Sequence, residues 1–98
     1  MYELIVNKFA EETLDQVARK NNKAYIRLSD SLDELEQNGL QASNVKPLKN
    51  APKIFRKRTG RWRILFTIRH KIIDVWIIGI EKDTDKDYKR WINLISYQ

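Results

Sequence analysis

The part of the sequence that most constrains the fold runs from residue 53 to residue 81. It contains three strand-like runs, Lys53 to Arg58, Arg61 to Arg69 and Ile72 to Glu81. Apolar side chains alternate along the second run, and the third is almost entirely apolar, which is typical of a central strand buried on both faces. The short breaks at Thr59-Gly60 and His70-Lys71 are suited to hairpin turns. These residues therefore predict an antiparallel meander.

The remaining elements are predicted by helical spacing. Tyr2 to Val6 indicates a short strand, and apolar residues three and four apart predict helices from Phe9 to Lys20 and from Ala24 to Gly39. A further amphipathic helix follows an expected cap at Thr84. We expect residues 40–52, which hold both prolines, to be a connector. The predicted class is α+β in the order β-α-α-β-β-β-α, an antiparallel sheet with a two-helix hairpin on one face and a C-terminal helix.

Length and charge limit what such a chain can do. Its 98 residues suit one domain spanning residues 1–98, and the absence of cysteine and of long apolar runs favours the cytoplasm. Residues 1–43 carry five Lys and Arg against eight Asp and Glu, whereas residues 44–98 carry fourteen against five. The net charges are thus −3 and +9, and the basic half predicts an anionic partner.

The basic segment "FRKRTGRWR" separates its charges by alternation. If Thr59 and Gly60 form the turn, Arg56 pairs with Arg63 and Arg58 with Arg61, so four arginines share one face. Opposed like charges destabilise a sheet by roughly 0.2 to 1 kcal/mol each. They therefore predict an anionic ligand or an internal carboxylate, although a solvated rim is the simpler alternative.

The second turn extends this arginine face to the central strand. With a turn at His70-Lys71, Arg63 pairs with Ile78, and Lys82 is expected on the same face. Arginine forks bind phosphate, and interleaved aromatic residues are suited to single-stranded RNA. The single histidine, His70, has no cysteine or second histidine to complete a metal site, so we expect neither a metal nor another cofactor.

The element order and two motifs resemble the RelE/ParE superfamily of toxins from type II toxin-antitoxin systems. The motifs are "GRWRILF" and "WIIGIEKDTDKDY". The resemblance implies an α/β fold with helices on one side of the sheet and a functional groove on the other. RelE-like members cleave mRNA on the ribosome, whereas ParE-like members inhibit DNA gyrase without cutting nucleic acid. Charge alone also fits a non-catalytic nucleic-acid-binding module.

The resemblance implies particular residues for RNA cleavage. The catalytic arginine falls on Arg63, the arginine after the central strand on Lys82, and the C-terminal tyrosine on Tyr88. Arg56 is the basic residue of the preceding strand, where a second lysine of the family is replaced by Ile54. The cations would stabilise the phosphate after attack by the RNA 2′-hydroxyl, without a metal.

Some roles remain open in this comparison. The general base could be Lys82, Tyr88 or a ribosomal group. The remaining basic residues are expected to bind flanking RNA: Lys53, Arg58 and Arg61. The implied partners are the ribosome with its mRNA and a cognate antitoxin, whose acidic amphipathic segment would cover the basic face. No membrane and no small-molecule cofactor are expected to take part.

Overall fold

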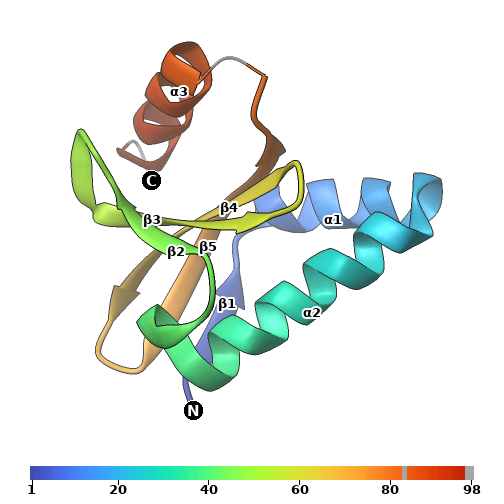
Figure 1. Cartoon of the computed structure of the whole chain (residues 1–98), viewed down its shortest axis with the longest axis horizontal. Coiled ribbons are helices and arrows are strands. Elements are labelled where there is room, and N and C mark those ends of the chain that lie inside the picture. Colours follow the sequence, from blue (N-terminus) through green and yellow to red (C-terminus); the bar gives the residue numbers. More distant parts are fainter. Residues whose placement is uncertain (83, 97–98) are drawn as a thin grey trace.

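The computed structural model describes residues 1–82 and 84–96, without the side chains of Thr84 and Asp85. The expected cap at Thr84 therefore lies outside the described residues. A five-stranded sheet is flanked by helices on both faces (Figure 1). The elements in chain order are β1 (Glu3–Val6), α1 (Lys8–Lys20), α2 (Asn22–Asn38), the 3-10 turn η1 (Gly39–Gln41), β2 (Val45–Leu48), β3 (Ala51–Thr59), β4 (Trp62–Arg69), β5 (Ile72–Ile80) and α3 (Thr84–Ser96).

The α+β class is confirmed, and the sheet is mixed. Its strand order is β1-β5-β4-β3-β2, in which β1 pairs with β5 in parallel and the other pairs are antiparallel. The interpretation of residues 40–52 as a connector is wrong, because Val45–Leu48 forms the edge strand β2. An edge strand tolerates Pro47, since a proline can leave its missing N–H on the unpaired side.

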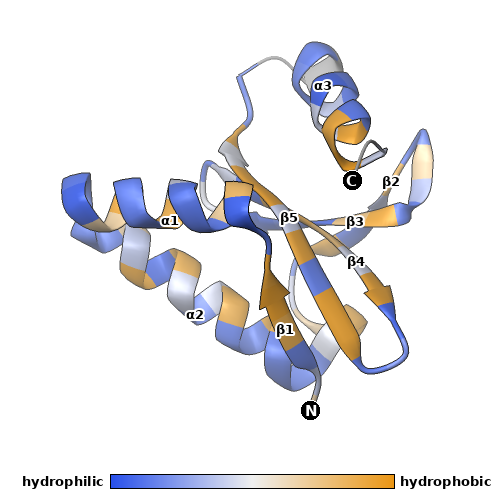
Figure 2. Ribbon diagram, turned by 180° about the vertical axis from the view of Figure 1, so that it is seen from behind, coloured by the Kyte–Doolittle hydropathy of each residue, from blue (hydrophilic) through white to orange (hydrophobic). Residues whose placement is uncertain are grey.

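The two-helix hairpin covers one face, as predicted. α1 and α2 are each capped by an asparagine: Asn7 Oδ1 accepts from the Phe9 amide, and Asn21 Oδ1 accepts from the Ala24 amide. The largest apolar cluster lies between these helices and the sheet. Its strand residues include the alternating positions of β4 and β5: Ile64, Phe66, Ile73, Val75 and Ile78. Figure 2 shows β5 coloured as largely hydrophobic along its length.

The C-terminal helix α3 packs on the opposite face and forms a second, smaller cluster. Trp91 of α3 is buried there with Leu65 and Ile77. A Cβ added to Gly79 would lie 2.8 Å from Cζ2 of Trp91, so glycine allows the indole to approach β5 closely. Within the described ranges, no helix is both long and apolar enough to span a bilayer.

The β3–β4 hairpin turns one residue later than predicted. Arg58 pairs with Arg63, so Gly60 and Arg61 form the turn and Thr59 stays in the strand. Gly60 has a φ of 60°, and the Thr59 hydroxyl is hydrogen-bonded to Ser31 of α2 at 2.6 Å. Each residue of β3 therefore pairs two positions further along β4 than predicted. Because side chains alternate with a period of two, the same residues still share a face. The common face of Arg58 and Arg63 is thus confirmed, although their predicted partners are wrong.

The β4–β5 hairpin contains a bulge that changes the face of the last residues of β5. Its turn is as predicted, with Arg69 opposite Ile72, but the register shifts between Leu65 and Phe66. Arg63 consequently pairs with Gly79 rather than Ile78. The extra residue is Trp76, whose indole Nε1 donates to Thr67 Oγ1 at 2.8 Å. The prediction that Lys82 shares the face of Arg63 is therefore wrong.

A buried lysine joins β3 to α2 and to the chain before β2. Lys57 is 1% exposed, and its Nζ donates to Glu34 Oε1 at 2.9 Å and to the Ser43 carbonyl at 2.6 Å. Glu34 also accepts from the backbone amide and the hydroxyl of Ser43. The hydrogen bond from Lys57 is the largest cause that lowers the pKa of Glu34 from 4.5 to about 2.

We expect Glu34→Gln to destabilise the protein at pH 7, because it leaves the Lys57 ammonium buried without its counter-charge. Glu34 is one-third exposed, so the loss should be about 2 kcal/mol, less than for a fully buried pair. The depressed pKa means that this stabilisation is complete above pH 4.5 and is lost as the pH falls toward 2. Urea unfolding at pH 7 and pH 3 measures both effects.

The matched control is Asp33→Asn, at the exposed neighbouring position of α2. It should change the free energy of unfolding by less than about 0.5 kcal/mol. Equal stability of Glu34→Gln and Asp33→Asn at pH 7 would contradict a stabilising role for the Lys57 pair.

Candidate functional site

A basic groove runs between the β2–β3 hairpin and α3. It has a volume of about 630 Å³. Among the described residues that line it, four are cationic and none is acidic. We call this site the basic groove. Its lining residues are Lys46, Pro47, Leu48, Lys49, Asn50, Arg56, Tyr88, Lys89, Ile92 and Asn93.

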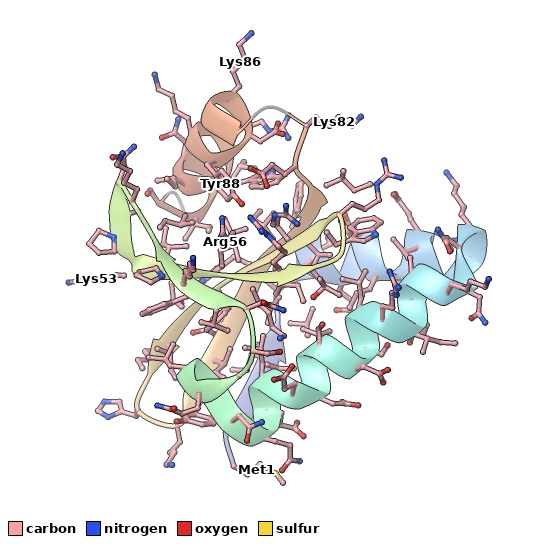
Figure 3. All side chains as sticks on the ribbon, in the orientation of Figure 1. Met1, Lys53, Arg56, Lys82, Lys86 and Tyr88 are labelled. Atoms are coloured by element: carbon pink, nitrogen blue, oxygen red, sulfur yellow. The ribbon has the colours of Figure 1, made fainter. Side chains whose placement is uncertain are left out.

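Two buried polar atoms in the basic groove have no hydrogen-bond partner among the residues that the structure describes. They are Nε of Arg56 and the hydroxyl of Tyr88. The ring of Tyr88 is held edge-on against Trp91, with centroids 5.2 Å apart. Figure 3 shows Arg56 rising from the sheet toward Tyr88 on α3. Because a buried polar group without a partner costs free energy, this pair is suited to receive an anionic ligand.

Arg63 is engaged by internal acceptors. Its Nε donates to Glu81 Oε2 at 2.7 Å, and its Nη1 donates to the carbonyls of Gly60 and Trp62. Its side chain is 12% exposed. The bulge in β5 explains this contact, because it places Glu81 beyond Gly79 on the face of Arg63. The internal carboxylate anticipated for the arginine face is therefore present for Arg63.

Lys82 and Lys53 lie away from the pair formed by Arg56 and Tyr88. Lys82 is exposed, its backbone amide donates to Asp87 Oδ2 at 2.7 Å, and its side chain points away from the pair (Figure 3). Lys53 is also exposed and points outward from β3 (Figure 3). It lines a separate hollow with Trp76. The structure thus brings together two of the four expected catalytic residues.

The other two arginines of the basic segment occupy different surroundings. Arg58 is exposed and lies opposite Arg63. Arg61 is exposed in the turn and lines a hollow beside α2 with Lys23 and Arg27. Neither residue lines the basic groove, so a role for either in RNA binding would extend the site toward the hairpin tip.

Sequence reasoning missed the contribution of β2. This strand pairs with β3 so that Lys46 lies directly opposite Arg56. The lysine that the family comparison sought at Ile54 is absent, and Ile54 is buried in the second apolar cluster. The signal that could have revealed β2 is the alternation of Val45, Lys46 and Pro47 before a short turn. The prolines obscured it, because they also indicate a loop.

We expect Arg63→Ala to lower stability, because it leaves the mostly buried carboxylate of Glu81 without its partner in this ion pair. The loss should be about 1 to 3 kcal/mol. Arg58→Ala is the matched control, since Arg58 is exposed on the same face, and its effect should stay within about 0.5 kcal/mol. Denaturant unfolding measures the free energy of unfolding of both variants, and equal values would refute a structural role for Arg63.

No protein-family model and no curated protein matches this sequence. Solved structures do match: the YoeB/ParE toxin from Agrobacterium tumefaciens has a TM-score of 0.71 at 12% identity, over 82% of this chain and 99% of that one. The YoeB dimer from Staphylococcus aureus gives 0.70 at 15% identity, over 83% and 98%. The YoeB-YefM complex from Staphylococcus aureus gives 0.69 at 17% identity, over 84% and 99%. The chain therefore has the fold of the YoeB/ParE toxins, and its resemblance to the RelE/ParE superfamily is confirmed at the level of the fold.

Proposed function

We propose that this protein is the toxin of a type II toxin-antitoxin system and inhibits translation by cleaving mRNA on the ribosome. The observation that carries the proposal is the basic groove, in which Arg56 and Tyr88 present buried polar atoms that have no partner in the described part of the chain. The fold supports the toxin assignment, and the net charge of +9 in residues 44–98 supports an RNA substrate.

In the proposed complex, one phosphate of single-stranded RNA lies between β3 and α3. The Arg56 guanidinium donates to its non-bridging oxygens, where negative charge accumulates in the transition state. The Tyr88 hydroxyl, held in place by Trp91, either donates to the phosphate or accepts the 2′-hydroxyl proton. The apolar side chains of Leu48 and Ile92 provide a surface for a neighbouring base.

Besides the RNA, the reaction needs only one group that accepts a proton and one group that donates a proton. The 2′-oxygen loses a proton as it bonds to the adjacent phosphorus, and the bond from phosphorus to the 5′-oxygen breaks. The leaving 5′-oxygen takes up a proton. The products are a 2′,3′-cyclic phosphate and a 5′-hydroxyl. Tyr88 can exchange one of these protons, and the other exchanges with water or a ribosomal group.

Arg63 and Lys82 have more distant roles in this proposal. Glu81 and two carbonyls hold Arg63, so its charge would act on the RNA as part of an oriented ion pair. Lys82 points away from Arg56 and Tyr88 (Figure 3) and would reach only RNA outside the basic groove. Their expected catalytic roles stay predictions, as do the contacts of Lys53, Arg58 and Arg61 with flanking RNA.

The proposed inhibitor of the toxin is a cognate antitoxin with an acidic amphipathic segment. YoeB of Staphylococcus aureus is found in complex with YefM. The four cations of the basic groove would attract acidic side chains, and its apolar floor would accept the apolar face of such a segment. Binding would consequently weaken as the salt concentration rises.

A second candidate function is inhibition of DNA gyrase without cleavage. The observation that favours it is the ion pair between Arg63 and Glu81. This pair leaves fewer uncompensated cations at the site than the proposed cleavage mechanism uses to stabilise the phosphate. Inhibition of supercoiling with no cut transcript would select this function. Harmless overexpression in bacteria would instead favour a non-toxic nucleic-acid-binding module.

The decisive experiment maps transcripts in a bacterial translation extract after addition of purified protein. We expect cuts only in translated mRNA, with 5′-hydroxyl ends downstream of each cut. Arg56→Gln and Tyr88→Phe should each reduce the cleavage rate by roughly tenfold to a hundredfold, because each removes a group that contacts the phosphate.

Lys20→Gln is the matched control, since it removes an exposed cation from α1, on the opposite face of the sheet from the basic groove. Its cleavage rate should stay within about twofold of the wild type, in keeping with an exposed charge in high dielectric. Wild-type cleavage by both Arg56→Gln and Tyr88→Phe would rule out the basic groove as the active site.

A further inference from the structure

Lys46 is the feature of the basic groove that neither the motif comparison nor the alternation pattern identified. It lies on the edge strand β2, directly opposite Arg56 on β3. Directly opposed residues of an antiparallel pair project from the same face, so the ammonium of Lys46 and the guanidinium of Arg56 share the α3 side of the sheet. Both residues line the basic groove with Tyr88.

The two cations of this sheet with mostly buried side chains near the hairpin are neutralised internally. Lys57 is paired with Glu34 at 2.9 Å and Arg63 with Glu81 at 2.7 Å. In the described part of the chain, neither Lys46 nor Arg56 forms an ion pair. Two opposed cations destabilise a strand pair, and the described residues that line the basic groove include no carboxylate to offset them. This contrast indicates that the compensating anion is external.

We infer that Lys46 and Arg56 together bind one internucleotide phosphate of single-stranded RNA. The inference rests on the proposed function and adds a substrate-contacting residue to it. The guanidinium would take two oxygens through its fork, while the ammonium would act as a movable point charge. Together with the Tyr88 hydroxyl, these groups approach the phosphate from two strands and one helix.

The surroundings of Lys46 favour RNA over a free anion. A volume of about 630 Å³ is far larger than one phosphate needs and lies in the range of nucleotide-sized ligands. Pro47, Leu48 and Ile92 contribute apolar surface beside the cations. The remaining lysines, Lys49 and Lys89, are exposed on the rim and would contact adjacent phosphates.

The test measures binding of a short single-stranded RNA with 2′-O-methyl groups, which cannot be cleaved. Fluorescence anisotropy at several salt concentrations compares Lys46→Gln with the wild type. We expect roughly tenfold or greater loss of affinity, and a salt dependence reduced by about 0.7 in the logarithmic slope, as for one lost phosphate contact. Lys46→Arg, which keeps the charge, should bind within about threefold of the wild type.

Lys20→Gln is the control, because it removes the same charge at an exposed position of α1, on the opposite face of the sheet from the basic groove. Its affinity should fall less than threefold. Lys46 is exposed and its removal relieves the repulsion with Arg56, so Lys46→Gln should melt at or slightly above the wild-type temperature, and a loss of affinity cannot come from unfolding. If Lys46→Gln and Lys20→Gln bind RNA equally well, the inference is overturned.

The outcomes also separate this inference from the proposed function. If Arg56→Gln stops transcript cleavage while Lys46→Gln binds and cleaves as the wild type, only the inference about Lys46 fails. If the wild type cleaves no transcript, the proposed function fails whatever the binding result. If Lys46→Gln weakens binding of a polyglutamate peptide but not of RNA, the inference is overturned in favour of a protein-binding surface.

Discussion

The orientation of β3 depends on one buried cation. Lys57 points into the space beneath α2, where Glu34 and the Ser43 carbonyl satisfy its ammonium. Because side chains alternate along a strand, Arg56 and Arg58 must then project from the opposite face. Turning the strand over would leave the Lys57 charge without Glu34 and would bury two guanidinium groups under the helices. The position of the basic groove is therefore a consequence of an ion pair on the other side of the sheet.

The two faces of the sheet are covered to different extents. α1 and α2 together bury the larger cluster, whereas α3 covers the other face through Trp91 and a few neighbours. Gly79 permits this close packing, since any larger residue would displace the indole. The hydroxyl of Tyr88, one helical turn from Trp91, is consequently buried at the wall of the basic groove. Because α3 covers this face incompletely, Arg56 Nε and the Tyr88 hydroxyl, which have no hydrogen-bond partner among the described residues, lie in the same groove.

Periodicity predicted the class of the fold and the common face of Arg56, Arg58 and Arg63, because a strand has a strict period of two residues. It could not predict the bulge at Trp76, since residues 75–80 are nearly all apolar and either register keeps apolar side chains buried. The edge strand β2 was missed for a different reason. Its proline is compatible with an edge position as well as with a loop, and local sequence does not distinguish the two.

The bulge changes the chemistry of the site as well as its geometry. In an unbroken register, Lys82 would add a fourth cation beside Arg63 at the end of the central strand. The observed register brings Glu81 there instead, and it neutralises Arg63. Uncompensated charge is thereby displaced from β4 and β5 to β2 and β3, where Lys46 and Arg56 face each other. The family motifs lie on the central strands β4 and β5. In this chain, the register instead places the two opposed cations, Lys46 and Arg56, at the edge of the sheet.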